Sequence, residues 1–217
     1  SRAAHGGDLH LTVSVVSRAR PAGDGARGPL VGVCSDYLAR LPVGGACRVF
    51  VRASSFRLPP ARETPILMFG PGTGIAPMRA LLHERAHMRA REGAALGRAL
   101  LYFGCKHREL DYLYREELER FEADGDVSLR LAFSREGAEK VYVQHVLARP
   151  ENAAEAWELV DARGAHVYVC GGTAMGADVH NALLAIVRER GGRTGAQASA
   201  YVDELKAAGR YVQELWA

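Results

Sequence analysis

From residue 66 onwards, short apolar runs alternate with segments of helical pattern, and this alternation limits the possible folds more than any other feature of the sequence. The runs are ILMF (66–69), ALLYF (99–103), LRLAF (129–133) and HVYVC (166–170). Short runs with almost no polar residues are typical of strands buried on both faces, because a strand with one wet face alternates apolar and polar residues. The pattern therefore predicts an α/β fold, a parallel sheet with helices on both faces.

Three helices can be placed by their apolar spacing or by their ends. Met175, Val179 and Leu183 are four residues apart, so they fall on one face of a helix. Asp111 is expected to be the N-cap of a second helix. Gly209 is expected to follow the end of a third, in the position where glycine is favoured.

The first sixty residues have a different pattern. Residues 9–16 (LHLTVSVV) alternate apolar and polar side chains, which predicts a half-buried antiparallel strand. A short helix over 31–41 and a second strand over 47–56 complete the remnant of a β-barrel. A proline-rich linker follows. We therefore expect two domains, the barrel remnant at 1–60 and a nucleotide-binding domain at 61–217.

Composition excludes several classes of function. The chain has 217 residues, of which 48% are hydrophobic and 24% charged, as in ordinary globular proteins. A net charge of +3 without a basic tract gives no support for nucleic-acid binding. The 4 cysteines and 8 histidines show no metal-ligand spacing, so no metal is expected and the thiols are expected to be free in a reducing, cytoplasmic compartment. No signal peptide and no run of about 18 apolar residues is present. The start at Ser1, without a methionine, indicates a piece of a longer protein.

The segment GPGTGIAP, residues 70–77, follows the first apolar run directly. A strand that enters a glycine-rich turn and then a helix presents free backbone N–H groups to an anion. Gly72 and Gly74 would allow close approach, and Thr73 would add a hydroxyl. From spacing alone, an ordinary turn between strand and helix explains these residues as well as a phosphate site does.

Six segments in order resemble the diflavin reductases, the family of NADPH–haemoprotein reductases, sulfite reductase flavoproteins and nitric-oxide synthase reductase domains. The segments are GPGTGIAP (70–77), YFGCKHRELDYLYREELERF (102–121), AFSRE (132–136), KVYVQH (140–145), VYVCGG (167–172) and the ending RYVQELWA. The resemblance covers essentially the whole chain and implies the C-terminal, ferredoxin–NADP reductase-like module. It implies NADPH and FAD as cofactors, with FMN in an N-terminal domain that this sequence does not include.

The resemblance assigns the adenine end of NADPH to one cluster. The family holds the 2′-phosphate with residues that match Ser134, Arg135, Lys140, Tyr142 and Gln144. The alternative is a helix cap beside a solvated charged face.

Another acidic position is implied at the same cofactor. Asp178 matches a family position near the NADP ribose or phosphates, and its alternative role is that of a solvated helix acid.

The resemblance also implies three catalytic residues. Cys170 matches a thiol beside the nicotinamide, Glu214 an acid near that thiol, and Trp216 an aromatic ring that covers the flavin. The alternatives are a small buried core residue for Cys170 and terminal packing for Trp216. Two positions depart from the family: Gly172 stands where an acid is common, and Glu214 where relatives usually carry aspartate.

For the flavin, the resemblance implies two segments of the barrel remnant. The turn that binds the FAD pyrophosphate would be Gly32, Val33, Cys34 and Ser35. The strand beside the flavin would contain Thr12, Val13 and Ser14. Arg18 replaces an aromatic residue of some relatives, and the family's Arg-x-Tyr-Ser flavin motif is not in the sequence.

The expected function is that of an NADPH–haemoprotein reductase, an enzyme that passes a hydride from NADPH to FAD and then electrons through FMN to a haem or other acceptor. The expected partner is a haemoprotein that docks on the FMN domain, with no nucleic acid and no membrane contact by this segment. A longer parent could be anchored on the cytosolic face of the endoplasmic reticulum. Two alternatives stay open: a single-flavin ferredoxin–NADP reductase, and an isolated NADP-binding fragment without activity of its own.

Overall fold

The computed structural model describes residues 1–20, 28–93 and 95–216. The chain separates into two compact units, Ser1–Leu9 with Ser55–Ala217, and His10–Ser54. Each unit is described by itself.

The larger unit is built around a parallel sheet of five strands. The strands are β3 (Ile66–Phe69), β4 (Ala99–Cys105), β5 (Ser128–Phe133), β6 (His166–Gly172) and β7 (Tyr211–Trp216). They lie in the order β5-β4-β3-β6-β7, and every neighbouring pair is parallel. The strand order reverses between β3 and β6, and open α/β sheets bind ligands beyond the carboxyl ends of the strands at such a point.

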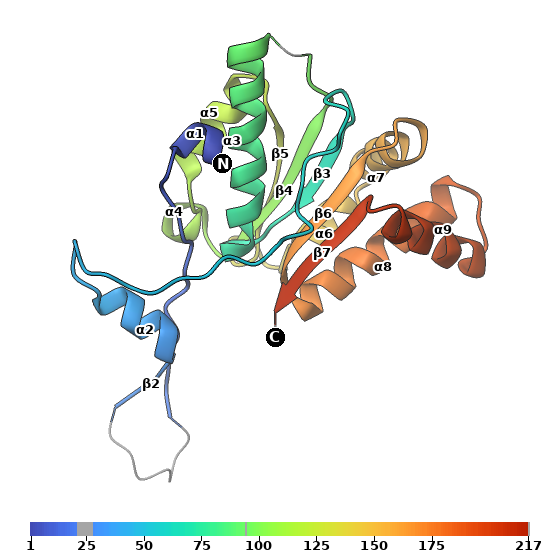
Figure 1. Cartoon of the computed structure of the whole chain (residues 1–217). Helices are drawn as coiled ribbons and strands as arrows, with labels where there is room; N and C mark the ends of the chain where they lie inside the picture. The colour runs from blue at the N-terminus through green and yellow to red at the C-terminus, as the bar shows by residue number, and fades with distance from the viewer. Residues whose placement is uncertain (21–27, 94, 217) are drawn as a thin grey trace. The chain divides into compact units, whose positions relative to one another are not determined.

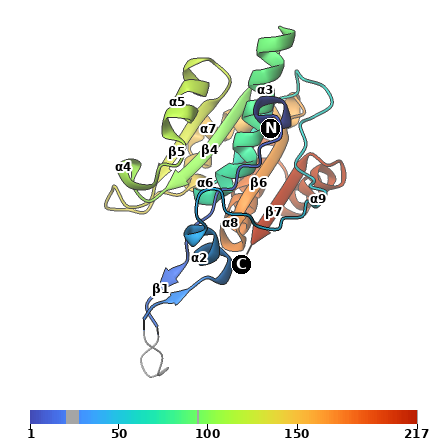
Figure 2. The same ribbon diagram turned by 60° about the vertical axis from the view of Figure 1, so that its left-hand side comes forward.

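Helices cover both faces of this sheet (Figures 1 and 2). One face carries α3 (Ile75–Glu92) and α5 (Arg115–Ala123). The other face carries α6 (Val143–Leu147), α7 (Pro150–Trp157), α8 (Thr173–Arg190) and α9 (Gly195–Ala207). The predicted fold class, a parallel sheet between two helical layers, is confirmed.

The central strands are buried on both sides. In β3, Ile66 and Met68 pack in the core beneath α3, whereas Leu67 and Phe69 pack in the core beneath α8. Successive side chains of a strand point to opposite faces, so a strand between two layers needs apolar residues at every position. This explains the uninterrupted apolar runs.

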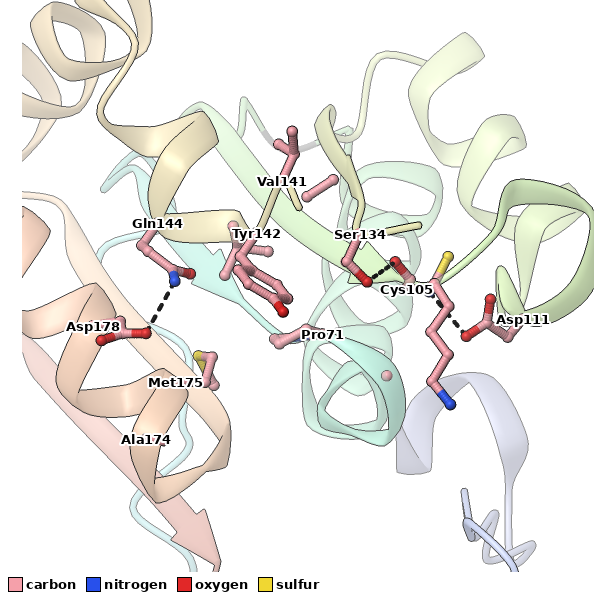
Figure 3. Close-up of a pocket in the computed structure, with 15 residues that line it drawn as sticks. Pro71, Cys105, Asp111, Ser134, Val141, Tyr142, Gln144, Ala174, Met175 and Asp178 are labelled. Carbon is pink, nitrogen blue, oxygen red and sulfur yellow. Dashed lines mark hydrogen bonds between the residues drawn. The ribbon is translucent and has the colours of Figure 1, made fainter. Parts of the chain in front are cut away.

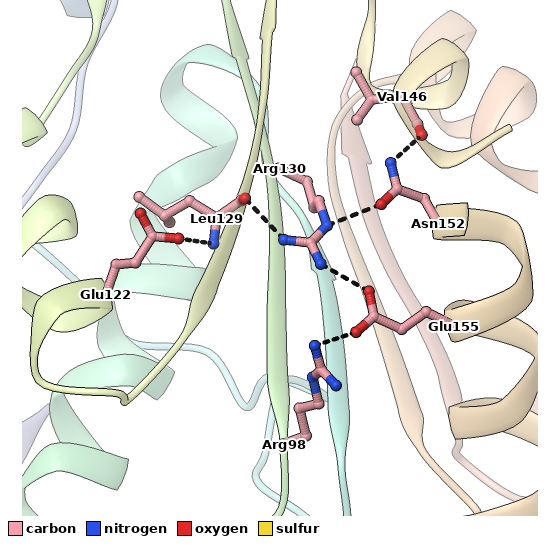
Figure 4. A network of polar contacts seen from close by, with 7 residues as sticks. All are labelled: Arg98, Glu122, Leu129, Arg130, Val146, Asn152 and Glu155. Atoms are coloured by element: carbon pink, nitrogen blue, oxygen red, sulfur yellow. Dashed lines mark hydrogen bonds and ion pairs between the residues drawn. The ribbon is translucent and has the colours of Figure 1, made fainter. Parts of the chain in front are cut away.

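A polar network joins the edge strand β5 to α7 (Figure 4). The Arg130 guanidinium donates from Nε to Asn152 Oδ1 at 2.9 Å and from a terminal nitrogen to Glu155 at 2.8 Å. Asn152 in turn donates to the Val146 carbonyl at 2.7 Å, and Arg98 forms an ion pair with Glu155. These contacts satisfy the half-buried Arg130 and fix α7 at this edge.

Four short elements complete the larger unit. They are α1 (Arg2–His5), η1, a 3₁₀ turn (Gly72–Gly74), α4 (Arg108–Asp111) and η2, a π-helical turn (Glu158–Ala162). The helix α1 lies against α3, where the Ser1 hydroxyl donates to Glu84 at 2.5 Å. No helix in the described part of the chain is both long and apolar enough to cross a membrane.

The structure corrects the expectation for Asp111 and confirms that for Gly209. Asp111 is the last residue of α4 rather than an N-cap, and its carboxylate accepts from the N–H groups of Lys106 at 3.0 Å and His107 at 2.7 Å. The following helix α5 instead begins after Tyr114. Gly209 follows α9 with φ +67°, a left-handed conformation that favours glycine.

The smaller unit contains little regular structure among its described residues. Its strands β1 (Ser17–Arg18) and β2 (Leu30–Val31) form a short antiparallel pair, and α2 (Val33–Arg40) is a helix as predicted. The strands predicted over 9–16 and 47–56 were wrong, because neither segment pairs with a partner strand in the described part of the chain.

The segment before β3 packs with the larger unit. Phe56 and Leu58 contact the core beneath α3, and the Tyr168 hydroxyl donates to the Arg57 carbonyl at 2.5 Å. The compact units thus part near residue 55. The division into functional domains at residue 60 stays a prediction.

Candidate functional site

A cavity of about 540 Å³ lies at the carboxyl ends of β3 and β4 and beside the beginnings of α6 and α8 (Figure 3). Five of the candidate cofactor-binding residues line it: Gly72, Ser134, Tyr142, Gln144 and Asp178. The cavity therefore opens at the sheet edge where the topology predicts a ligand.

The glycine-rich loop contributes the wall nearest β3. An ideal Cβ on Gly74 would lie 2.1 Å from the carbonyl oxygen of Cys170, and one on Gly70 would lie 2.6 Å from that of Gly74. Gly72 has φ +55°, in the left-handed region. The loop thus packs tightly on β6 and leads into α3 through the turn η1, in which the Gly74 N–H donates to the Pro71 carbonyl at 3.0 Å and the Ile75 N–H donates to the Gly72 carbonyl. Gly72 lines the cavity, whereas Thr73 and Gly74 do not.

The loop after β5 forms the opposite wall. Its start is fixed to the end of β4, because the Ser134 N–H donates to the Cys105 carbonyl at 2.9 Å and the Arg135 N–H to the Lys106 carbonyl at 3.0 Å. The Ser134 hydroxyl also donates to the Cys105 carbonyl, at 3.3 Å. The Arg135 and Lys140 side chains are exposed and do not line the cavity. They are two exposed cations of the loop that forms this wall.

A hydrogen bond crosses the cavity between α6 and α8. Gln144 Nε2 donates to Asp178 Oδ2 at 3.0 Å (Figure 3). Tyr142, at the N-cap of α6, is exposed, and its N–H donates to His145 Nδ1 at 3.3 Å. The beginning of α6 therefore presents a phenol and an amide to the same space.

Three polar residues of the lining were not predicted as site residues: Cys105, Lys106 and Asp111. Burial raises the pKa of the Cys105 thiol to about 12, and Asp111 adds to this effect. Burial alone would raise the pKa of Asp111, but the N–H groups of His107 and Lys106 lower it below its ordinary value. The sequence signal for these residues was their position just after the apolar run 99–103. The carboxyl ends of parallel strands lie at the same side of a sheet, where ligands bind.

The three proposed catalytic residues come together on two neighbouring strands. In the pairing of β6 with β7, Cys170 lies opposite Glu214, and Gly172 opposite Trp216. Alternation along each strand places Cys170, Glu214 and Trp216 on the side of the sheet that carries α3. None of the three lines the 540 Å³ cavity.

The environments of these three residues differ. Cys170 is 5% exposed, and burial, with a smaller effect of Glu214, raises the pKa of its thiol to about 11. Trp216 is 45% exposed and Glu214 half-buried. Leu215, between them, packs on Gly176 of α8, where a Cβ would lie 2.5 Å from Leu215 Cδ1. The end of β7 is therefore anchored by Leu215, and the indole is left accessible.

The smaller unit holds the residues suggested for the flavin. The Gly32 N–H donates to the Val16 carbonyl at 3.0 Å, and the Ser35 hydroxyl accepts from the Val16 N–H at 3.1 Å. These bonds fix the turn at the start of α2, and a Cβ on Gly32 would lie 2.6 Å from Ser35 Oγ. Val33 and Cys34 are exposed in the first turn of the helix.

The segment Thr12–Ser14 has no regular secondary structure, and Val13 and Ser14 are exposed. No group of three or more histidine, cysteine, aspartate or glutamate side chains in the described ranges could hold a metal ion.

Comparison with known proteins shows the class of this chain. Residues 68–181 match the family described as the oxidoreductase NAD-binding domain, and the chain belongs to that family. The match begins in β3 and ends in α8, so it covers the glycine-rich loop, the 134–144 loop and Cys170.

More specific likenesses are to NADPH–cytochrome P450 reductases. The chain is 46% identical to that of Oryctolagus cuniculus over 193 residues, which is 85% of this chain and 28% of the relative. It is 42% identical to that of Cavia porcellus over 220 residues and 39% identical to that of Drosophila melanogaster over 217, in both cases 98% of this chain and 31% of the relative. The resemblance to the ferredoxin–NADP reductase-like module of the diflavin reductases is confirmed. The chain spans about three tenths of the length of these relatives.

Proposed function

We propose that this chain is the NADPH-binding module of a flavoprotein reductase, which delivers a hydride from NADPH to FAD. The observation that carries the proposal is the cavity at the switch point of the parallel sheet, lined by the glycine-rich loop and the loop after β5. The relatives named NADPH–cytochrome P450 reductase support NADPH as the hydride donor.

The glycine-rich loop fits the pyrophosphate of the dinucleotide. Gly74 brings the turn against β6, and the positive end of the α3 dipole is directed towards bound anions. A side chain at Gly74 would collide with the Cys170 carbonyl. The site therefore depends on the close approach of this turn to β6, which only glycine allows.

The 2′-phosphate is assigned to the loop between β5 and α6. Arg135 and Lys140 provide two exposed cations, and Ser134 and Tyr142 provide two hydroxyls within nine residues. A phosphate dianion would form charge-assisted hydrogen bonds with these groups, which NAD cannot form because it lacks the phosphate. Gln144 and Asp178 would then contact the adenosine ribose between α6 and α8.

Cys170 and Glu214 are proposed to position the nicotinamide. With a pKa raised to about 11, the thiol stays protonated at neutral pH and acts as a neutral S–H group of small volume rather than as a nucleophile. Trp216, accessible at the end of β7, is proposed to cover the flavin ring until the nicotinamide replaces it.

The turn Gly32–Ser35 is proposed to bind the FAD pyrophosphate. The first N–H groups of α2 are available there, and Gly32 leaves no room for a Cβ beside Ser35. Thr12, Val13 and Ser14 are proposed to run beside the flavin. FAD supplies the chemistry of accepting a hydride and releasing single electrons, while the protein positions the reactants.

Electrons are proposed to leave FAD through an FMN domain to a haemoprotein, on the cytoplasmic side of the cell. Two other functions are alternatives to the proposed NADPH-dependent flavoprotein reductase. A single-flavin ferredoxin–NADP reductase is disfavoured by the LYREEL and KVYVQH segments and by the names of the relatives. An isolated NADP-binding fragment is favoured by the many exposed apolar residues of the smaller unit, from which we expect little FAD to be retained.

Calorimetric titration of the purified chain with NADP⁺, NAD⁺ and 2′,5′-ADP tests the proposal. We expect NADP⁺ and 2′,5′-ADP to bind at least about tenfold more tightly than NAD⁺, because each phosphate contact with a charged group contributes about 1.5–3 kcal/mol. Equal affinity for NAD⁺ and NADP⁺ would refute the assignment of the 2′-phosphate site. Flavin absorbance after gel filtration separates the alternatives, since stoichiometric FAD would exclude the isolated fragment.

A further inference from the structure

A second cavity, of about 160 Å³, lies at the amino-terminal ends of β4 and β5, whereas the first lies at the carboxyl ends of the strands. It is bounded by α3 and by the turns that enter β4 and β5, and is lined by Arg85, Arg89, Gly97, Arg98 and Asp126 among others. Nothing in the proposed reductase chemistry uses this end of the sheet.

Arg85 is the most deeply placed cation of this cavity. It is 3% exposed, and one terminal nitrogen donates to the Gly97 carbonyl, whereas Nε has no hydrogen-bond partner in the parts of the chain that the structure describes. The Gly97 backbone is held in place, because its N–H donates to the Arg62 carbonyl at 2.9 Å and an ideal Cβ on Gly97 would lie 2.1 Å from the Glu63 carbonyl oxygen. A buried, charged donor is therefore left unsatisfied.

Asp126 lines the same cavity and, within the described part of the chain, lacks hydrogen-bond donors, whereas Arg85 Nε lacks an acceptor. Its side chain is 1% exposed and lies 3.0 Å from a terminal nitrogen of Arg89. Neither carboxylate oxygen accepts a well-formed hydrogen bond from any described residue. The turn that ends α5 fixes its position, since Gly125 has φ +77° and the Asp126 N–H donates to the Phe121 carbonyl at 2.8 Å.

These groups define what a ligand must be. Arg98 shares the Glu155 carboxylate with Arg130, so the three arginines that line the cavity outnumber its lining carboxylate, Asp126, and this favours an anion. The anion must accept from Arg85 Nε and must also donate to Asp126, because an ionised carboxylate can only accept. Sulfate has no proton to donate at neutral pH, whereas hydrogen phosphate has acceptor oxygens and a hydroxyl.

We propose that this cavity binds hydrogen phosphate as a free ion and rejects sulfate. The cavity has room for a small tetrahedral ion together with water. The same chemistry could come from the phosphate of a nucleotide, but the small volume favours the free ion.

Calorimetric titration with inorganic phosphate and with sulfate tests the proposal. The double variant Arg135→Ala, Lys140→Ala is used, so that the two exposed cations proposed for the 2′-phosphate cannot contribute. We expect saturable binding of one phosphate and at least tenfold weaker binding of sulfate at the same ionic strength. A cavity that holds only water would give no saturable phosphate binding, and that result would overturn the proposal, as would equal binding of the two ions.

The variant Asp126→Asn, made in the same double variant, is expected to gain affinity for sulfate, and misfolding cannot produce such a gain. The amide provides a donor for an acceptor-only ion, so sulfate should bind about as tightly as phosphate. Asp124→Asn, at an exposed neighbour, is the matched control and should keep the preference for phosphate. Sulfate binding that stays weak in Asp126→Asn would overturn the role of Asp126.

Adenosine monophosphate distinguishes the free ion from a nucleotide phosphate. In the double variant it should not displace bound phosphate. Displacement at concentrations similar to those of inorganic phosphate would overturn the assignment to the free ion.

Discussion

The two units of this chain bury their apolar residues to very different extents. In the larger unit the central strands β3, β4 and β6 are buried between two helical layers, and residues such as Phe103 and Leu100 are fully buried. In the smaller unit Ser35 is the one buried residue among positions 10–20 and 28–54. Val33 there is 87% exposed and Phe50 78%. A parallel sheet that is covered on both faces buries the apolar side chains of its strands. A pair of two-residue strands is too small to form such a core.

This difference bears directly on the two proposed sites. The nucleotide site rests on turns whose positions are set by the core beneath them, as Gly74 shows by its contact with β6. The turn at Gly32 is fixed chiefly by two hydrogen bonds to Val16. We therefore expect the first site to be preorganised in this chain, and the second to be much less so.

The largest expected contrast is between two phenylalanines. Phe103→Ala removes a ring that is fully buried and stacked on Tyr112 at 5.1 Å, and should lower the free energy of unfolding of the larger unit by about 3–5 kcal/mol. Phe50→Ala should change it by less than about 0.5 kcal/mol, because that ring is exposed. Urea unfolding followed by circular dichroism measures both. Similar losses in the two variants would show that the smaller unit has a core of its own.

The four thiols provide a chemical version of the same comparison. Cys34 and Cys47 are exposed, whereas burial raises the pKa of Cys105 to about 12 and of Cys170 to about 11. At pH 8 only about one Cys170 in a thousand is then a reactive thiolate. Alkylation followed by mass spectrometry should modify the two exposed cysteines at least about a hundredfold faster, until urea is added. Equal rates for all four would contradict the burial of the larger unit's thiols.

The raised pKa of Cys170 also sets the sign of a pH effect. Its value of about 11 in the folded chain lies above the ~8.5 of an unfolded thiol, so the folded state favours the protonated form. The contribution of Cys170 to the free energy of unfolding is therefore fully present below about pH 8.5 and is lost as the pH rises towards 11. Cys170→Ala should therefore flatten the loss of stability between pH 8.5 and 11, as measured by urea unfolding across that range. An unchanged slope would contradict the assigned burial.

A smaller contrast is expected between glycines. Gly74→Ala places a methyl group against the Cys170 carbonyl and should cost about 1–3 kcal/mol of stability, together with NADP⁺ affinity. Gly195→Ala, in open space at the start of α9, is the control and should be neutral or slightly stabilising. Urea unfolding and calorimetry report the two effects. Unchanged NADP⁺ binding in Gly74→Ala would separate this turn from the nucleotide site.

The buried parts of the fold were predictable because burial leaves a direct pattern in the sequence. The runs at 66–69 and 99–103 must be apolar at every position, since each side chain meets a helical layer. The strand β7 was not predicted, because it lies at the edge of the described sheet, next to β6, and carries Gln213 and Glu214 among its apolar residues. The alternation over 9–16 predicted a strand wrongly, since alternation cannot supply the neighbouring strand on which a ladder depends.

The candidate site was predictable only where a motif marked it. Ser134, Tyr142 and Gln144 were found through the family's pattern, and they line the cavity. Lys106 was not found, because its position there depends on where the end of β4 meets the loop after β5. Asp111 was assigned to a helix cap for a similar reason: the carboxylate folds back to the N–H groups of residues 106 and 107 instead.

The central claim is that the larger unit binds the 2′-phosphate of NADPH with the loop between β5 and α6. The most direct measurement is calorimetric titration of Arg135→Ala with NADP⁺ and NAD⁺, with Arg188→Ala, an exposed arginine on α8, as the matched control. Arg135→Ala should weaken NADP⁺ binding about tenfold or more and leave NAD⁺ binding unchanged, because the lost contact is to the phosphate alone. The control should keep the wild-type affinity for both. An equal loss for both coenzymes, or no loss for either, would contradict the account.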